Sequence, residues 1–201
     1  MASLLVALVL LVAACGGGGQ ESGSGTQEGG SGSEPSAGGD SAPASGEPVK
    51  FGILLPATGD LGDLGGPMIN AAQLAFRHAQ EAGGILGGRE VAVVQRDSQT
   101  SEVAARDGAD QLANVEKVVA VIGDAGSGSS FAALEVLKAA QVVQISPSST
   151  SPAFTTYDDG GFFFRTAPSD SLQGAVMAKL ALQEGFKRAA TLALNNDYGV
   201  G

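Results

Sequence analysis

The fold is decided by Val49-Lys50-Phe51-Gly52-Ile53-Leu54-Leu55, an apolar run that ends at Pro56 and predicts a buried β-strand. Short runs rich in Val and Ile recur further along the chain, at residues 90–95, 118–122 and 142–145. Apolar residues at helical spacing predict helices between these runs, at residues 67–82, 101–115 and 131–140. Strands that alternate with helices predict an α/β fold with a doubly wound parallel sheet.

Polar loops rich in glycine and serine follow three of the predicted strands, at residues 56–66, 123–130 and 146–156. In open parallel sheets, ligands bind at the carboxyl ends of the strands, where such loops meet the first turns of helices. We therefore expect a ligand site where these three loops converge.

The alternation of helix and strand begins again in the last part of the chain. An N-cap candidate at residues 167–170 precedes a predicted helix at residues 171–184, and a further strand is expected at residues 189–194. The chain stops shortly after this strand, before the helix that should cover it. We therefore expect a second α/β unit that is truncated.

The first residues predict export from the cytoplasm. Residues 2–14 form an apolar run that is too short to span a bilayer but suits a signal peptide, residues 1–14. The run ends at Leu11-Val12-Ala13-Ala14-Cys15, which resembles a bacterial lipobox. Cys15 is the only cysteine in the chain, and lipidation explains a single thiol in an exported protein. Residues 15–48, rich in Gly and Ser, are expected to be the lipidated cysteine and a disordered tether that holds the protein at the extracytoplasmic face of the membrane.

Composition excludes several classes of function. Acidic residues outnumber basic ones by 21 to 11, and the basic residues form no stripe, so a nucleic-acid partner is not expected. With His78 as the single histidine, neither a metal site nor a serine-dependent hydrolase is favoured, although serine-rich loops keep the hydrolase as an alternative. No dinucleotide motif follows the first strand, and we expect no cofactor.

An ordered set of motifs carries a resemblance to a known family. The set comprises residues 50–55, Thr58-Gly59, residues 82–89, Val121-Ile122-Gly123, residues 145–150, Phe164-Arg165-Thr166 and Asp197-Tyr198-Gly199. Residues 49–201 resemble the type I periplasmic-binding family, in its branched-chain amino acid branch. The resemblance implies two lobes around a ligand cleft, with lobe one at residues 49–166. Residues 167–201 would be the hinge crossing and the start of a truncated lobe two.

The resemblance also implies the residues that bind the ligand. Ser127, Ser148, Ser149 and Thr150 would hold its polar groups, and Tyr198 would reach across from lobe two. Leu64 stands where relatives often place an aromatic wall against the ligand side chain. The acidic residue that binds the ligand ammonium would lie in lobe two beyond Gly201.

Several alternatives stay open at this point. Ser127 is equally suited to cap a helix, residues 148–150 to form a turn, and Tyr198 to pack in a core. Asp60, Asp63 and Asp124 lie in the predicted cleft loops, where we interpret them as solvated surface.

The implied function is capture of a branched-chain or other small amino acid and its delivery to an ABC permease, without covalent chemistry. Amides, urea or aromatic acids are alternative ligands. A lipoprotein that presents its ligand to a signalling partner is an alternative role.

Overall fold

The computed structural model describes residues 46–201. The predicted signal peptide, the lipidation site Cys15 and nearly all of the predicted tether lie outside the described residues. None of the helices within residues 46–201 has both the length and the apolar character that a membrane crossing requires.

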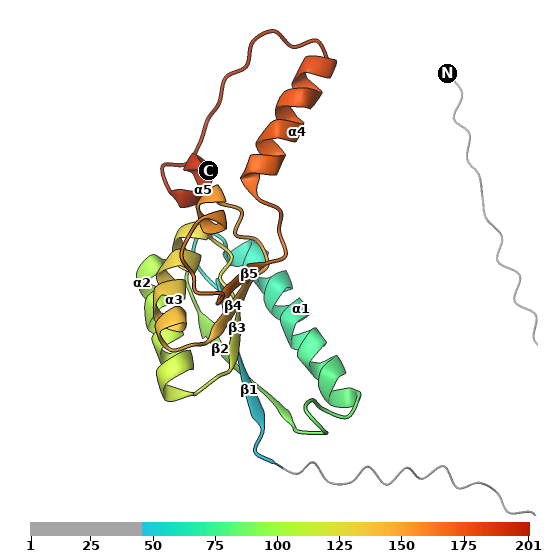
Figure 1. Cartoon of the computed structure of the whole chain (residues 1–201), viewed down its shortest axis with the longest axis vertical. Coiled ribbons are helices and arrows are strands. Elements are labelled where there is room, and N and C mark those ends of the chain that lie inside the picture. Colours follow the sequence, from blue (N-terminus) through green and yellow to red (C-terminus); the bar gives the residue numbers. More distant parts are fainter. Residues whose placement is uncertain (1–45) are drawn as a thin grey trace, which may run out of the picture. The chain divides into compact units, whose positions relative to one another are not determined.

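A five-stranded parallel sheet forms the centre of the fold, in the order β2-β1-β3-β4-β5 (Figure 1). The strands are β1 (Val49–Leu55), β2 (Val91–Asp97), β3 (Ala120–Gly123), β4 (Val143–Ser146) and β5 (Phe163–Arg165). All four pairings are parallel, as the alternation of strands and helices predicts. The α/β fold with a parallel sheet is therefore confirmed.

Helices cover the two faces of the sheet. Helix α1 (Gly62–Glu81) lies on one face, and α2 (Glu102–Asp110) and α3 (Ser127–Ala139) lie on the other (Figure 1). A π-helical turn, Gln111–Val115, continues α2 without a break. A short 3₁₀ helix, Pro152–Thr155, lies between β4 and β5.

The core of the fold has an apolar layer on each side of β1. Leu54 packs with Ala109 of α2, with Leu112 of the π-helical turn and with Leu137 of α3. Its neighbours Ile53 and Leu55 pack with Ile69 of α1. Side chains alternate between the faces of a strand, so a strand buried on both faces needs an apolar residue at every position. This requirement explains the unbroken apolar run Ile53-Leu54-Leu55.

Three features differ from the sequence prediction. Helix α1 begins at Gly62, five residues before Pro67, so Pro67 lies inside the helix and cannot donate a hydrogen bond to the carbonyl of Asp63. Helix α3 begins at Ser127 and not at residue 131. Residues 163–165, which were not predicted as a strand, form β5 at the edge of the sheet beside β4.

The last part of the chain consists of α4 (Asp170–Gln183), a non-regular segment and the short helix α5 (Asp197–Val200). The predicted strand at residues 189–194 is absent from this part of the described chain. A strand requires a hydrogen-bonded neighbour, and no other strand lies beside these residues. From residue 166 onward no residue is buried, and apolar side chains such as Leu172, Met177 and Leu192 are exposed to solvent.

Candidate functional site: a cavity at the carboxyl ends of the strands

A cavity of about 340 Å³ opens at the carboxyl ends of the strands. The loops after β1, β2, β3 and β4 all contribute to it, together with residues from the start of α5. Its lining residues are Asp60, Leu61, Leu64, Met68, Thr100, Glu102, Ala125, Gly126, Ser127, Gly128, Ser129, Ser148, Leu194, Asn196 and Tyr198. The location agrees with the site that the loop pattern predicts.

The first turn of α3 forms one wall of this cavity. Gly126 is the N-cap residue, and no side chain caps the helix. Within residues 46–201, no hydrogen-bond acceptor is found for the backbone N–H groups of Ser127, Gly128 and Ser129. Unpaired N–H groups and the positive end of the helix dipole favour an anionic group at such a turn. This wall is therefore suited to bind a carboxylate.

Ser127 and Ser148 face the cavity, although each also makes a bond to the protein. The Ser127 hydroxyl accepts a hydrogen bond of 3.3 Å from the backbone N–H of Ser151. The Ser148 hydroxyl donates to the Ala125 carbonyl oxygen at 2.8 Å, which leaves its oxygen lone pairs to accept a bond from a ligand. Ser127 does not cap α3 with its side chain, so the capping interpretation is wrong for this residue.

Ser149 and Thr150 do not line the cavity. Ser149 is fully buried, and its hydroxyl lies 2.7 Å from the hydroxyl of Ser130 in α3. Thr150 has a buried hydroxyl oxygen with no hydrogen-bond partner among the described residues. The structure thus brings Ser127, Ser148, Leu64 and Tyr198 to one cavity and places Ser149 and Thr150 behind its wall.

Asp124 holds the two serine-rich loops together. Its backbone carbonyl accepts hydrogen bonds from the hydroxyls of Ser146 at 2.6 Å and of Ser130 at 3.0 Å. Its carboxylate Oδ1 accepts from the Ser98 hydroxyl at 2.9 Å and from the backbone N–H of Ala125. The side chain is fully buried, so the expectation that Asp124 belongs to the solvated surface is wrong.

The environment of Asp124 disfavours its charged form. Burial raises the pKa of its carboxyl, and the nearby charge of Asp97 acts in the same direction. Hydrogen bonds from serine hydroxyls and from the backbone of Ala125 oppose the shift without cancelling it. Its second carboxylate oxygen, Oδ2, has no partner among the described residues, which adds to the cost of the charge.

Apolar side chains form the opposite part of the cavity. Leu61, Leu64 and Met68 come from the first turns of α1 and the residue before it, and Leu194 and Tyr198 come from the end of the chain. Leu64 and Tyr198 are each more than half exposed. The cavity therefore combines a polar wall with an apolar one, as a site for a small amphiphilic molecule requires.

The loop after β2 also contributes to the cavity, although it was not among the predicted loops. Thr100 and Glu102 line the cavity, but only the loops after the first, third and fourth strands were considered. The rule that ligands bind at the carboxyl ends of parallel strands applies to every strand, and it points to residues 98–101 as well. Ser101, which caps α2 through its hydroxyl, marks where that helix begins.

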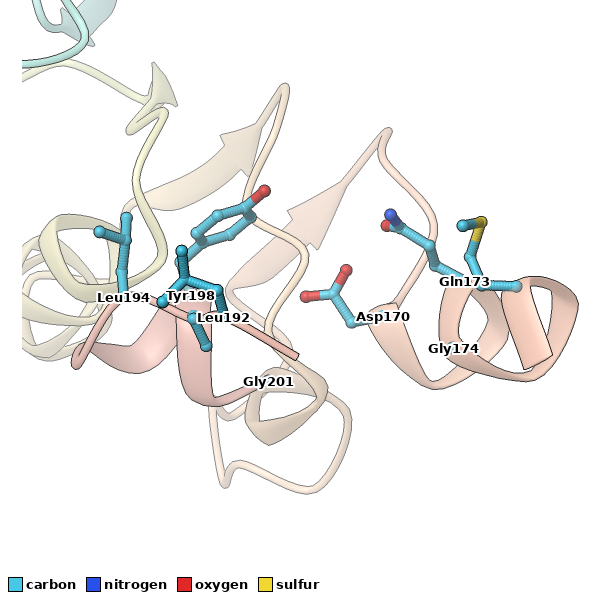
Figure 2. Close-up of a pocket in the computed structure, with 10 residues that line it drawn as sticks. Asp170, Gln173, Gly174, Leu192, Leu194, Tyr198 and Gly201 are labelled. Carbon is cyan, nitrogen blue, oxygen red and sulfur yellow. The ribbon is translucent and has the colours of Figure 1, made fainter. Parts of the chain in front are cut away.

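A second hollow, of about 370 Å³, lies between α4 and the end of the chain (Figure 2). Figure 2 shows Asp170 and Gln173 of α4 on one side and Leu192, Leu194 and Tyr198 on the other. No residue of α4 or α5 is buried, so this hollow separates two segments without a core of their own. It is a weaker candidate site than the cavity at the strand ends. Within residues 46–201, no three acidic, histidine or cysteine side chains gather closely enough to hold a metal ion.

The fold is a parallel α/β sheet with a cavity at the carboxyl ends of its strands. The model of the periplasmic binding protein family matches residues 48–201, and the chain belongs to this family. The resemblance stated from the motifs is therefore confirmed, as is the type I fold.

Three members of the family are similar to this chain. The chemotactic signal transduction system substrate-binding protein of Halobacterium salinarum is 37% identical over 161 residues, which cover 76% of this chain and 39% of that protein. The branched-chain amino acid transporter substrate-binding protein of Streptococcus pneumoniae, solved with isoleucine, is 31% identical with a TM-score of 0.64. That match covers 69% of this chain and 39% of the solved one.

A solute-binding protein of an ABC transporter from R. palustris, solved with benzoate, has 25% identity and a TM-score of 0.67 over 76% of this chain and 42% of its own. The chain thus spans about two fifths of the length of each of these proteins. The relatives include binders of amino acids and of an aromatic acid.

Proposed function

We propose that this chain contains the ligand-capturing lobe of an extracytoplasmic solute-binding protein, which serves an ABC importer and binds a branched-chain or other small amino acid. The observation that carries the proposal is the uncapped first turn of α3, which lines the cavity with Ser127 and Ser148. Free N–H groups and the Ser127 hydroxyl, which keeps its own proton to donate, suit the carboxylate of an amino acid. The Ser148 hydroxyl oxygen can accept a bond from the ammonium group, and the apolar wall around Leu64 suits an aliphatic side chain.

The mechanism is capture without covalent chemistry. The carboxylate of the ligand binds at the first turn of α3. The side chain of the ligand packs between Leu64 and Met68 of α1 on one side and Tyr198 of α5 on the other. A second lobe then closes over the ligand by a hinge motion, and the closed form delivers it to the permease. In this role Ser149 and Thr150 shape the loop that carries Ser148 and do not contact the ligand directly.

The same proposal includes the anchor. Cys15 carries the lipid, and the Gly/Ser-rich segment up to residue 48 tethers the lobe to the extracytoplasmic face of the membrane. Mass spectrometry of the mature N-terminus tests this part. A diacylglycerol adduct on Cys15 is expected, and a mature protein that retains residues 1–14 would contradict it.

Ligand sensing for a signalling partner is the second candidate role. The relative from Halobacterium salinarum, whose name describes a chemotactic system, favours it. Both roles use the same cavity and differ only in the partner of the closed form. Co-purification with a permease or with a signalling receptor separates them.

A thermal-shift experiment tests the ligand proposal. A ligand that binds only the folded protein raises its melting temperature by linkage, so the full-length protein is screened against amino acids, amides, urea and benzoates. A rise with leucine, isoleucine or valine is expected. It should shrink in Ser127→Ala and Ser148→Ala and persist in the control Thr156→Ala, which removes an exposed hydroxyl outside the cavity. A rise with benzoate alone would contradict the amino acid proposal.

A further inference from the structure

The guanidinium group of Arg165, the last residue of β5, bonds to the loop after β4 at three points. Its Nη1 donates to the backbone carbonyls of Ser149 at 3.3 Å and of Ser151 at 2.9 Å, and its Nη2 donates to the Thr155 hydroxyl at 2.9 Å. Its Cζ lies 5.9 Å from the ring centroid of Phe154, in the same loop. Arg165 forms no ion pair among the described residues. Its charge therefore serves to hold this loop.

The loop connects Arg165 to the cavity. The backbone N–H of Ser151 donates to the Ser127 hydroxyl oxygen at 3.3 Å, and Ser127 lines the cavity. Ser151 thus bonds to Arg165 through its carbonyl and to Ser127 through its N–H. Both serines are buried, so little water competes for the bond between them.

This bond determines what the Ser127 hydroxyl can offer to a ligand. A hydroxyl group has one proton and two acceptor lone pairs. Because the N–H of Ser151 occupies a lone pair of Ser127, the rotation of the hydroxyl is restricted and its proton stays free for an acceptor such as a carboxylate. Arg165 does not line the cavity itself, so it can act on a ligand only through the loop.

Three consecutive carbonyls of the loop accept hydrogen bonds. Arg165 donates to the first and the third, those of Ser149 and Ser151. The second, that of Thr150, accepts from the backbone N–H of Asp170 at 3.0 Å, where α4 begins. Arg165 therefore supplies two of the three bonds that fix the loop backbone between the cavity and the point where the chain leaves the sheet.

We infer that Arg165 is a positioning residue for ligand binding: it fixes Ser151, which in turn orients the Ser127 hydroxyl toward the ligand carboxylate. This inference rests on the proposed function and adds to it a residue outside the cavity. A lysine at this position keeps the charge but lacks the planar set of N–H groups, so it cannot hold two carbonyls and a hydroxyl together.

A double-mutant cycle separates positioning from a purely structural role. Calorimetric titration of the full-length protein gives the Kd for L-leucine in the wild type, Arg165→Gln, Ser127→Ala and the double variant. Arg165→Gln should weaken leucine binding about tenfold, the factor that corresponds to one charge-assisted hydrogen bond. In the Ser127→Ala background the factor should fall below about twofold, because the hydroxyl that Arg165 positions is gone. A purely structural arginine gives the same factor in both backgrounds.

Two further variants complete the experiment. Arg165→Lys should restore part of the affinity and bind leucine about threefold more weakly than the wild type. It replaces Arg165→Gln in the cycle if the glutamine variant does not fold. Arg106→Gln, which removes an exposed arginine of α2, is the matched control and should leave the Kd unchanged.

The outcomes separate this inference from the proposed function. Equal factors in the two backgrounds, or unchanged leucine binding in Arg165→Gln, overturn the inference and leave the proposed function standing. A wild-type protein that does not bind leucine contradicts the proposed ligand, and hydrogen exchange then tests the inference without one. Peptides within residues 147–156 should exchange faster in Arg165→Gln than in the wild type. Unchanged exchange there overturns the positioning role.

Discussion

The Thr58 hydroxyl donates a 2.7 Å hydrogen bond to the carboxylate of Asp97, although 39 residues separate the two in the sequence. The same carboxylate accepts hydrogen bonds from the backbone N–H groups of Ala57 at 2.8 Å and of Gln99 at 2.9 Å. Asp97 is the last residue of β2, and Thr58 belongs to the loop after β1. This one carboxylate therefore fixes the loop that leads to the cavity residues Asp60 and Leu64.

The first prediction concerns the removal of this carboxylate. Asp97→Ala leaves several donors without their acceptor and should lower the free energy of unfolding by about 1–3 kcal/mol at pH 7. Ligand affinity should also fall, because the loop loses its attachment. Urea denaturation and ligand titration measure the two effects. Asp107→Ala, which removes an exposed aspartate of α2, is the control and should change neither.

The pH dependence of Asp97 follows from its hydrogen bonds. Burial alone would raise the pKa of this carboxyl, but the bonds from Thr58, Gln99 and Ala57 outweigh burial and hold the pKa below its ordinary value of 3.8. Its contribution to stability is therefore present above pH 3.8 and is lost as the pH falls through the lowered pKa. The stability difference between wild type and Asp97→Ala should narrow in strong acid. A difference that stays constant down to that range would contradict this explanation.

The second prediction concerns Asp124, whose pKa is shifted upward and not downward, so its effect on stability changes with pH in the opposite direction. Burial raises the pKa of its carboxyl, so the folded state holds a proton that the unfolded state releases near pH 3.8. Stability from this group is full below pH 3.8 and is lost as the pH rises through the raised pKa. Asp124→Asn cannot ionise, so the loss of stability between acid and neutral pH should be smaller than in the wild type. Denaturation at several pH values tests it, and parallel curves for the two proteins would refute the assignment.

The third prediction uses two adjacent glycines of α1. Gly65 is buried, and a Cβ on it would overlap the carbonyl oxygen of Pro56, whereas a Cβ on Gly66 would meet nothing within 4 Å. Gly65→Ala should destabilise the fold by about 1–3 kcal/mol through overpacking. Gly66→Ala should stabilise it by up to about 1 kcal/mol, because alanine favours a helix. Thermal denaturation of the two variants shows whether the first loses stability and the second gains it. Equal changes in stability would show that the close approach of Gly65 to Pro56 does not disfavour a side chain at position 65.

The fourth prediction concerns the aromatic cluster under the loop after β4. Phe154 is buried between Phe131 and Phe163, with ring centroids 3.7 and 4.2 Å away. Phe154→Ala should lower the free energy of unfolding by about 3–5 kcal/mol, since it removes a large buried side chain and leaves a cavity. Leu86→Ala, at a position that is 74% exposed, is the control and should change stability by less than about 0.5 kcal/mol. Urea denaturation measures both variants. A small loss in Phe154→Ala would mean that the stack contributes little to the fold.

Much of the sheet was predictable because its strands are short apolar runs, and the last four residues of β1 are buried on both faces. Such strands need continuous apolar runs, and residues 49–55 are the clearest case. Strand β5 was missed, because it has only three residues and lies at the edge of the sheet. The prediction of a strand at residues 189–194 was wrong. The sequence favours a strand there, but the described residues contain no neighbouring strand with which it could pair.

The candidate site was predictable in position but not in the direction of its side chains. The loops after β1, β3 and β4 and the residues Ser127 and Ser148 were expected and do line the cavity. The approach of Glu102 to Gly128 was not expected, because it depends on how α2 and α3 pack together.

The sequence by itself determined the parallel α/β sheet and the end of it at which the cavity lies, since both follow from local runs of apolar residues and from the loops between them. Only the tertiary structure decided which hydroxyls reach the cavity. Ser148 and Ser149 are neighbours of the same residue type, yet Ser148 faces the cavity and Ser149 bonds to Ser130 behind it. The physical reason is that the two hydroxyls bond to different residues of a segment that is distant in the sequence: Ser148 donates to the carbonyl of Ala125 in the loop after β3, and Ser149 bonds to Ser130 of α3.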